Sequence, residues 1–526
     1  MPFRGKGLQS LKKIRVVVSL LFFFLLSFLF VDLWNVVPVP VSNVLVSIQL
    51  VPSITKTLTL LTATSFGLLF VVLLTLLFGR VYCSSICPLG TLQDLVIRVA
   101  GRNRKHRWFR YSGAPVALHY AILAVVAIAF LGGSTLLLNL VEPFSNHGRI
   151  FSTLVSPIVV LLNNAVAWLL GQFGTYSLPT LAIRSVVIGV TFLPLAFLAV
   201  VVYLSYNYGR LFCNSLCPAG ALLAILSRVS LFKIVIDEET CTECKLCEKV
   251  CKARCIQADT KRLDFDACVS CFNCIDVCPS VGLKYEALWK NKISPKPAEV
   301  DTGRRTFMNA AVTSLLAAVV PGSTSQDTTA ASALSFDESR RHPIAPPGAI
   351  SIEHFSSLCT ACHLCVTVCP TQVLYPSLLE YGVAGILQPK MNYAASYCNY
   401  DCILCTEICP SGAILPVTAA AKKEIQIGKS VFVKEDCVVV SKKKACAACA
   451  EHCPTKAVRM VPYEGNLMIP ELNNEICVGC GACEYPCPTE PRRAIYVVAN
   501  SVHQKAKRPK VERLEEAVDK SKEFPF

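Results

Sequence analysis

The sequence predicts a multidomain protein in which an α-helical membrane domain is followed by small α+β cysteine-rich modules. Three observations support this fold class. Of the 526 residues, 53% are hydrophobic and only 17% are charged, which is too apolar for an ordinary soluble protein. Most of the long apolar runs lie in residues 1–232, the expected membrane domain. The 29 cysteines recur at short, regular spacings.

Four apolar stretches are each close to the roughly 20 residues that a helix needs to cross a bilayer core. They are Val16–Val37, Leu58–Phe78, Val116–Leu140 and Val186–Leu204. A further stretch, Ile150–Leu170, contains Pro157 and the pair Asn163 and Asn164. We therefore predict four main spans, with a fifth membrane helix in the twin-arginine-like segment described below.

An internal repeat determines how these spans are oriented. Residues 78–90 read FGRVYCSSICPLG, and residues 208–220 read YGRLFCNSLCPAG. Both copies directly follow an apolar stretch, so we expect them on the same side of the membrane. The basic residues from Arg98 to Arg110 place that side inside. An even number of spans then separates the copies, and Ile150–Leu170 is expected to be re-entrant or to lie along the outer surface.

The formal net charge of +15 has a topological explanation. Much of the basic excess lies in short segments beside apolar stretches, which is typical of cytoplasmic loops. We therefore expect no nucleic-acid partner.

Residues 233–288 carry two cysteine runs that indicate iron-sulfur binding. A cubane cluster needs four thiolates, and the run C-x-x-C-x-x-C-x-x-x-C-P supplies three from one tight loop and a fourth that binds the other cluster in two-cluster ferredoxins. The expected sets are Cys241, Cys244, Cys247 with Cys278, and Cys268, Cys271, Cys274 with Cys251. Lys252 stands where proline is usual, and Cys255 is a spare or alternative ligand. This two-cluster module is predicted to be cytoplasmic.

Residues 351–498 repeat the motif four times. Two regular runs enclose two stretched ones, whose first gaps are three and eight residues. This order hints at nested pairing, first with fourth and second with third, while sequential pairing stays open. Zinc sites do not need so many quartets. The expected ligands are Cys359, Cys362, Cys365, Cys369, Cys398, Cys402, Cys405, Cys409, Cys437, Cys446, Cys449, Cys453, Cys477, Cys480, Cys483 and Cys487.

Residues 289–350 form a linker that contains a segment typical of a twin-arginine signal or anchor. Thr302–Asn309 includes paired arginines, an apolar run reaches Val320, and small residues with an A-x-A pattern follow. This segment predicts a periplasmic second module. The alternative is a basic linker beside a buried helix. The charged tail, residues 499–526, is expected to be a solvated end or a docking element.

The repeated segments add four thiols on one membrane face: Cys83, Cys87, Cys213 and Cys217. Four thiols are the number needed for one more cluster or a bound metal ion. Redox-active or merely structural thiols are the alternative.

A quinone site needs polar groups at the membrane edge that can accept two protons. The candidates are His119 in an apolar stretch, and Glu142, His147 and Arg149 in an outer loop. The alternative is that these residues anchor the loop.

No haem is expected. The segment from Cys359 to His363 matches C-x-x-C-H, but its cysteines belong to a complete ferredoxin run. Among the apolar stretches only Val116–Leu140 contains a histidine, so paired histidine ligands for a b-type haem are lacking.

With these motifs, the chain resembles two known proteins joined end to end. Residues 16–288 are similar to NapH, the membrane component of a quinol dehydrogenase pair in periplasmic nitrate reduction, and residues 302–498 resemble the MauM/NapG polyferredoxins. The resemblance implies a prokaryotic cytoplasmic (inner) membrane, quinol as electron donor, and a periplasmic cytochrome c, multihaem cytochrome or terminal reductase as acceptor. The six runs predict about six 4Fe-4S clusters, and the membrane thiols a seventh if they hold one. The fusion, Lys252, Cys255 and the stretched runs depart from the family pattern.

Two other groups share parts of this pattern. The RdxA/CcoG/FixG group has the same membrane motifs and implies copper reduction during oxidase assembly, but the long second module argues against it. Redox-sensing regulators of the NosR/NirI group also share the C-x-x-x-C-P spans, and the lack of an N-terminal sensory domain speaks against that function. The leading interpretation is the quinol-oxidising electron-transfer subunit of an oxidoreductase.

Overall fold

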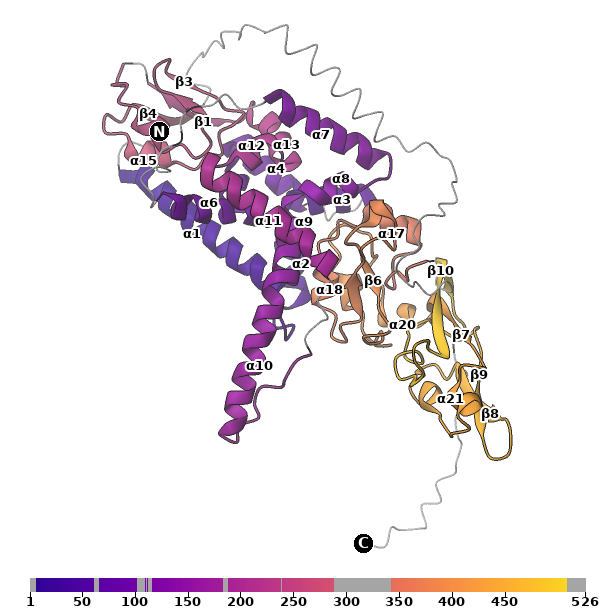
Figure 1. Cartoon of the computed structure of the whole chain (residues 1–526). Coiled ribbons are helices and arrows are strands. Elements are labelled where there is room, and N and C mark those ends of the chain that lie inside the picture. The colour runs from indigo at the N-terminus through magenta and orange to yellow at the C-terminus, as the bar shows by residue number, and fades with distance from the viewer. Residues whose placement is uncertain are drawn as a thin grey trace, which may run out of the picture.

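The computed structural model describes residues 6–60, 66–101, 109, 111, 116–182, 188–237, 239–287 and 342–508. Figure 1 shows a helical domain with one cysteine-rich module packed at one end and a second module at the other. We call these parts the helical domain (residues 6–231), the first module (232–287) and the second module (342–508). The twin-arginine-like segment lies outside the described residues.

The helical domain contains two helices that are long and apolar enough to cross a membrane by length and composition, Pro143–Gln172 and Gly189–Tyr208. Its elements are α1 (Lys6–Leu29), α2 (Val39–Ser47), α3 (Leu50–Leu60), α4 (Phe66–Phe78), α5 (Val81–Ser85), α6 (Pro88–Ala100), α7 (Val116–Leu131), α8 (Leu136–Val141), α9 (Pro143–Ile150), the π-helical turn η3 (Phe151–Val155), α10 (Ser156–Gln172), α11 (Ile188–Tyr208), α12 (Leu211–Ser215) and α13 (Pro218–Ser227).

Two of the expected spans are shorter than the sequence suggested. α1 ends at Leu29 rather than near Val37. The stretch Val116–Leu140 is divided, because α7 ends before Gly133 and α8 starts after it. Gly133 has φ +82°, a backbone conformation that glycine adopts without steric cost and that a helix does not contain.

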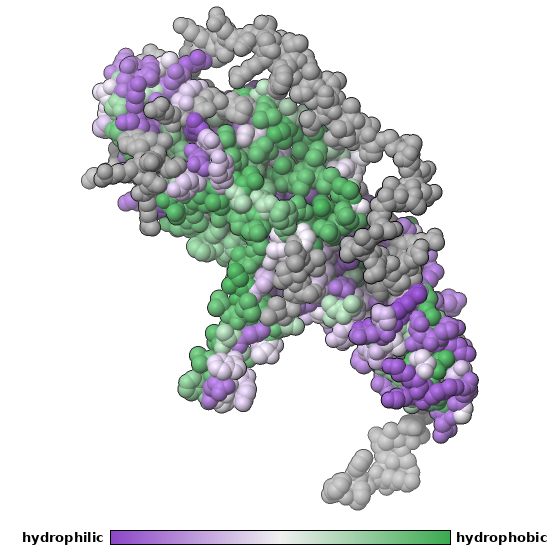
Figure 2. Space-filling view, in the orientation of Figure 1, coloured by the Kyte–Doolittle hydropathy of each residue, from purple (hydrophilic) through white to green (hydrophobic). Residues whose placement is uncertain are grey.

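The stretch Ile150–Leu170 is helical throughout. One continuous helical rod, Pro143–Gln172, is formed by α9, η3 and α10. Only 6% of its most apolar part is buried. Pro157 is the second residue of α10 and follows directly on the π-helical turn η3, and the rod continues through it. Asn164 instead binds the backbone of Leu181 in the returning segment. Figures 1 and 2 show α10 as an apolar arm that projects from the domain.

The first module is built from short strands and single-turn helices. β1 and β4 form one antiparallel pair, and β2 and β3 form another. In the β1–β4 pair the buried side chains are Ile234 of β1 and Leu283 and Tyr285 of β4, which are apolar or aromatic. The elements are β1 (Phe232–Ile236), α14 (Leu246–Lys249), β2 (Ile256–Gln257), β3 (Arg262–Leu263), α15 (Asn273–Val277) and β4 (Leu283–Ala287).

The second module is also built from short helices and antiparallel strand pairs, three pairs in its described residues, and it extends beyond the expected boundary at residue 498. β10 runs to Lys505 and pairs with β7, so the start of the expected charged tail is a strand. The elements are α17 (Ile352–Leu358), α18 (Leu364–Thr367), β5 (Leu374–Pro376), η5 (Val383–Gly385), β6 (Pro389–Met391), α19 (Leu404–Ile408), α20 (Ala419–Lys422), β7 (Ile425–Phe432), α21 (Val438–Ser441), α22 (Ala448–Glu451), β8 (Val458–Pro462), β9 (Met468–Leu472) and β10 (Ile495–Lys505).

The hydrophobic cores cross the boundaries between these parts. One buried cluster joins α4, α6 and α13 to the cysteine loops of the first module. Another joins Leu26 and Leu29 of α1, and Phe144 of α9, to the start of the second module. A separate core lies in the distal half of the second module. Both modules are therefore packed against the helical domain.

Candidate iron-sulfur sites

The four regularly spaced cysteine runs share one backbone conformation. In each run the residues before and after the second cysteine have positive φ. Left-handed residues of this kind turn neighbouring N–H groups to one side and form concavities that suit an anionic group. The residues are Glu243 (φ 54), Lys245 (59), Ser270 (49), Phe272 (60), Ala361 (50), His363 (67), Gly479 (74) and Gly481 (79).

The cysteines of the first module surround two small cavities. Site 1 is lined by Cys241, Cys244, Cys247 and Cys278. Site 2 is lined by Cys251, Cys268, Cys271, Cys274 and the additional Cys255. In both sites the fourth cysteine of one run lies with the first three of the other. The sulfur atoms of Cys251 and Cys255 are 3.5 Å apart, so the spare thiol lies within site 2.

The second module groups its cysteines sequentially, the first run with the second and the third with the fourth. The nested pairing that the spacing suggested is wrong, because Cys409 approaches the first run and Cys369 approaches the second. The groups are site 3 (Cys359, Cys362, Cys365, Cys409), site 4 (Cys369, Cys398, Cys402, Cys405), site 5 (Cys453, Cys477, Cys480, Cys483) and site 6 (Cys437, Cys446, Cys449, Cys487).

The four sites of the second module form a series. Sites 3 and 4 exchange fourth cysteines, as do sites 5 and 6. The backbone N–H of Cys398 in site 4 donates to the carbonyl oxygen of Cys480 in site 5 at 2.9 Å, which joins the two pairs. Sites 3 and 6 are therefore the two ends of the series.

The helical domain brings its four cysteines together in one buried place, which we call the thiol quartet. Cys83, Cys87, Cys213 and Cys217 are each only 5–6% exposed, and the Cys217 thiol interacts electrostatically with the other three. Each cysteine of a cubane binds its own iron, so its sulfurs stand farther apart than the ligands of a single ion. Within the described ranges, no three His, Cys, Asp or Glu side chains are close enough to bind one ion.

Two fully buried arginines cross between the halves of the quartet. Arg80 donates to the carbonyl oxygen of Cys213 at 3.0 Å, and Arg210 donates to that of Cys83 at 2.6 Å. Each arginine belongs to one copy of the repeat and binds the cysteine loop of the other copy. Sequence analysis missed these two residues, although the Gly-Arg pair that precedes the cysteines in both copies was a usable signal.

The same arginines lie between the thiol quartet and site 2 of the first module. Arg210 interacts electrostatically with both Cys213 and Cys271, and Arg80 acts on both Cys213 and Cys268. The first module is seated directly on this region, because the backbone N–H of Arg210 donates to the carbonyl oxygen of Lys252 at 2.9 Å. The quartet and site 2 are thus neighbours in one buried cluster.

The second module meets the helical domain through site 3. The side chain of Asn139 donates to the carbonyl oxygen of Cys359 at 3.2 Å, and the Ser152 hydroxyl lies 3.2 Å from Nδ1 of His363. Gly148 allows the close approach, since a Cβ there would overlap the carbonyl oxygen of Cys362. The other ring nitrogen of His363 lies 2.9 Å from the Leu387 oxygen, so both nitrogens have protein partners.

The four residues considered for a quinone site lie in two places, His119 beside the thiol quartet and the other three in and next to α9. His119 is buried beside the quartet, 2.9 Å from the carbonyl oxygen of Cys217. Glu142 caps α9 by accepting from Phe144 and Ser145. His147 and Arg149 likewise make buried contacts within the protein.

His147 is fully buried among phenylalanine rings, with Nε2 3.1 Å from the Ser27 hydroxyl. Arg149 donates to the carbonyl oxygens of Ser145 and Asn139. The Cys362 thiol interacts electrostatically with Glu142 and Arg149. This arrangement fits the alternative expectation, that the residues anchor the loop, here against site 3.

Three protein-family models, all for iron-sulfur binding, match four segments of the chain. A 4Fe-4S binding domain matches residues 60–107 and 189–236, which contain the thiol quartet. Two different 4Fe-4S dicluster domains match residues 358–414 and 444–490. Each dicluster match falls on two consecutive runs, in agreement with sequential pairing.

Similar proteins are of the ferredoxin type. An uncharacterized protein of Methanocaldococcus jannaschii is 26% identical over 44% of this chain and 73% of its own length. The ferredoxin-type protein NapF of Escherichia coli K12 is 28% identical over 30% of this chain and 87% of its own. The methylamine utilization ferredoxin-type protein MauM of Methylobacillus flagellatus is 31% identical over 27% and 63%. No solved structure matches.

Proposed function

We propose that this chain, a ferredoxin-type iron-sulfur electron-transfer protein related to NapF and MauM, carries electrons across a membrane, from the quinol pool to a periplasmic redox enzyme or cytochrome. The observation that carries the proposal is the position of the thiol quartet, inside the helical domain and beside site 2. A chain of redox centres that carries electrons across a bilayer core of roughly 30 Å needs an intermediate centre.

The length of α1 supports a position of the two modules on opposite membrane faces. Its 24 residues correspond to about 36 Å at 1.5 Å per residue. Near its start, Lys12 forms an ion pair with Asp276 of the first module at 2.6 Å. Near its end, Leu26 packs in the core shared with the second module. One helix of bilayer length thus joins both contact surfaces.

The repeat supports an even number of crossings between its two copies. Both copies contribute to one quartet, so their chain segments leave the membrane at the same face. In this proposal α7 and α11 supply the two crossings, α1 and α4 supply the others, and the apolar α10 lies along the membrane surface. The first module is cytoplasmic and the second periplasmic.

The ligand sets follow from the grouping of the cysteines. Sites 1 to 6 each offer four thiols for a 4Fe-4S cluster, and such a cluster accepts and releases one electron. The thiol quartet offers a seventh set. A cubane held by four thiolates is anionic, and the buried guanidinium groups of Arg80 and Arg210 would offset that charge. Their presence favours an anionic group at the quartet.

The acceptor is expected to dock at site 6. This site ends the series and lies near α21 and β8, at the tip of the second module farthest from the helical domain (Figure 1). The visible surface there is mainly hydrophilic (Figure 2), which suits a soluble partner.

One experiment tests the role of the quartet. Full-length protein is inserted in vesicles with the first module outward, and a membrane-impermeant reductant is added outside. EPR then follows the clusters of the second module. In wild type the clusters of the second module should become reduced. In the Cys83→Ser/Cys217→Ser variant only the clusters of the first module should become reduced.

A matched control is Ser215→Ala, which alters the same turn without removing a thiol and should conduct like wild type. Equal conduction by the double cysteine variant would refute the path through the quartet. Reduction by a menaquinol analogue in place of the impermeant reductant tests the donor separately. If only that reduction fails, quinol is rejected as the electron donor, and the proposed electron path through the quartet still stands.

A further inference from the structure

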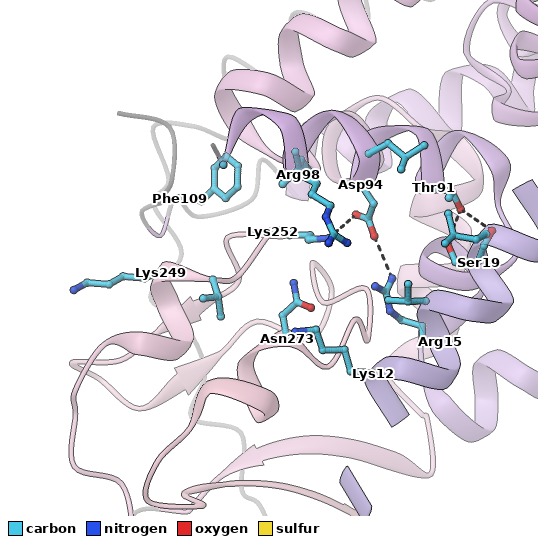
Figure 3. A pocket seen from close by; sticks show the side chains of 16 residues that line it. Lys12, Arg15, Ser19, Thr91, Asp94, Arg98, Phe109, Lys249, Lys252 and Asn273 are labelled. Carbon is cyan, nitrogen blue, oxygen red and sulfur yellow. Dashed lines mark hydrogen bonds and ion pairs between the residues drawn. The ribbon is translucent and has the colours of Figure 1, made fainter. Parts of the chain in front are cut away.

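A ligand-sized cavity lies where the helical domain meets the first module. Its volume is about 440 Å³, within the range of small-molecule sites. Figure 3 shows that α1 and α6 form one wall and that the loops next to site 2 form the other. Neither the family matches nor the proposed wire assigns it a ligand.

The lining of this cavity is strongly cationic. Its one carboxylate, Asp94, lies 3.1 Å from Arg15 and 3.3 Å from Lys252 and also pairs with Arg210 behind the wall. One carboxylate therefore serves three cations. The lining cations are Lys12, Arg15, Arg98, Lys249 and Lys252. An anion in the cavity would meet complementary charge.

Arg15 has one N–H donor, at Nε, that makes no hydrogen bond to the described residues. It is only 6% exposed, and it lines the cavity. One of its terminal nitrogens donates to the carbonyl oxygen of Ser84 and to Asp94, but its Nε has no partner among the described residues. Burying a donor without an acceptor is unfavourable, and a ligand oxygen would satisfy it.

The cavity also straddles a boundary between polar and apolar surface. On α1, the basic Lys12 and Arg15 line it first, and the apolar Leu20 lines it more than one turn beyond Arg15. Outside the cavity the neighbouring surface of α1 is apolar, since Leu21 is 55% exposed. A ligand with an anionic head and an apolar chain fits both parts of this lining.

We propose that this cavity binds the headgroup of an anionic phospholipid, with its acyl chains along α1 and α6. Basic pockets at the inner edge of membrane helices bind such headgroups. The phosphate accepts from Arg15 Nε and lies near Arg98 and Lys249, and it joins the helical domain to the first module. The inference does not depend on quinol oxidation.

The site explains a departure in the first cysteine run. Lys252 stands where proline is usual, and it lines the cavity directly beside Cys251 of site 2. Asn273 lines the cavity beside Cys274 of the same site. A bound phosphate therefore lies next to site 2, where its negative charge opposes addition of an electron.

The test uses full-length protein in neutral detergent with phosphatidylglycerol as the probe. Native mass spectrometry counts the lipids retained against phosphatidylcholine. Wild type should prefer phosphatidylglycerol, and the Arg98→Gln/Lys249→Gln variant should bind it roughly tenfold more weakly or worse, because each lost cation contributes to the attraction. Arg15→Lys, which keeps the charge but removes Nε, should also weaken binding.

The control is Lys505→Gln/Lys507→Gln, which removes two cations of the second module that pair with Glu424 and Glu475 away from the cavity. It should bind like wild type. Equal retention of both lipids, or equal loss in both double variants, would overturn the proposal. Displacement of the lipid by a short-chain naphthoquinone would identify a quinone site instead, and displacement by millimolar inorganic phosphate would show that the headgroup alone is recognised.

Discussion

The two copies of the repeat build one site, but they hold it differently. In both copies an arginine follows a glycine of positive φ and binds the cysteine loop of the other copy. Arg210 is also paired with the Asp94 carboxylate of the first copy. The position equivalent to Asp94 in the second copy is Ala224, so Arg80 binds the Asn214 amide oxygen and the Asp266 carbonyl instead. Both copies therefore keep the same arginine geometry, but only Arg210 has a carboxylate that balances its charge.

The largest expected effect comes from removing the paired arginine. Arg210→Met leaves Asp94 as a buried carboxylate with fewer partners, and loss of one member of a buried ion pair costs about 3–5 kcal/mol. Thermal unfolding in detergent should show the loss. Arg80→Met removes hydrogen bonds but exposes no carboxylate, so it should cost less.

If Arg80→Met destabilises the protein as much as Arg210→Met does, the asymmetry between the copies has no energetic meaning. The double variant Arg210→Met/Asp94→Leu removes both charges and should recover part of the loss.

The dependence of stability on acid pH should reveal the same difference between the copies, because only the first copy contains Asp94. Burial alone would raise the pKa of Asp94, but the charges of Arg210, Lys252 and Arg15 outweigh burial and hold the pKa well below its usual range. A carboxylate with a depressed folded-state pKa contributes stability above its unfolded pKa of about 3.9. This contribution, on the order of 2–3 kcal/mol, is lost as the pH falls through the folded pKa.

Asp94→Asn should therefore flatten the fall in melting temperature between pH 4 and pH 2. The variant is less stable than wild type at neutral pH, so the measurement is the slope rather than the absolute value. An unchanged slope would show that other carboxylates dominate the acid response.

Much of the fold was predictable from spacing and periodicity. The cysteine runs predicted the modules, and the repeat predicted that Cys83 and Cys213 would share one membrane face. The contact between site 3 and α9 was not predictable, because Gly148, Asn139 and His363 form it from segments far apart in the chain. Glu142 illustrates a related difficulty: a helix cap, which the structure shows for this residue, and a proton acceptor look alike in sequence.

The glycines of the repeat should behave alike in both copies, in contrast to the arginines. A Cβ on Gly90 would overlap the carbonyl oxygen of Cys83, and a Cβ on Gly220 would overlap that of Cys213. Gly90→Ala and Gly220→Ala should each cost about 1–3 kcal/mol through overpacking. Gly101→Ala is the control, since its nearest contact would be 3.4 Å.

A large difference between the two alanine variants would mean that the copies also differ in backbone packing. Iron content should fall with stability in both, because the clash moves a cysteine loop of the quartet.

The smallest effects are expected where each copy is tied to the first module. Lys12 pairs with Asp276 from the side of the first copy, with 35% and 30% of the two side chains exposed. Arg228 pairs with Asp266 from the second copy, with 52% and 20% exposed. Pairs this exposed contribute about 0.2–1 kcal/mol and are screened by salt. Lys12→Ala and Arg228→Ala should therefore each lower the melting temperature slightly at low ionic strength, and the difference from wild type should shrink in 0.5 M salt. A loss that salt does not reduce, for Arg228 in particular, would locate the stabilisation in its stacking on the Tyr120 ring at 5.3 Å rather than in its charge.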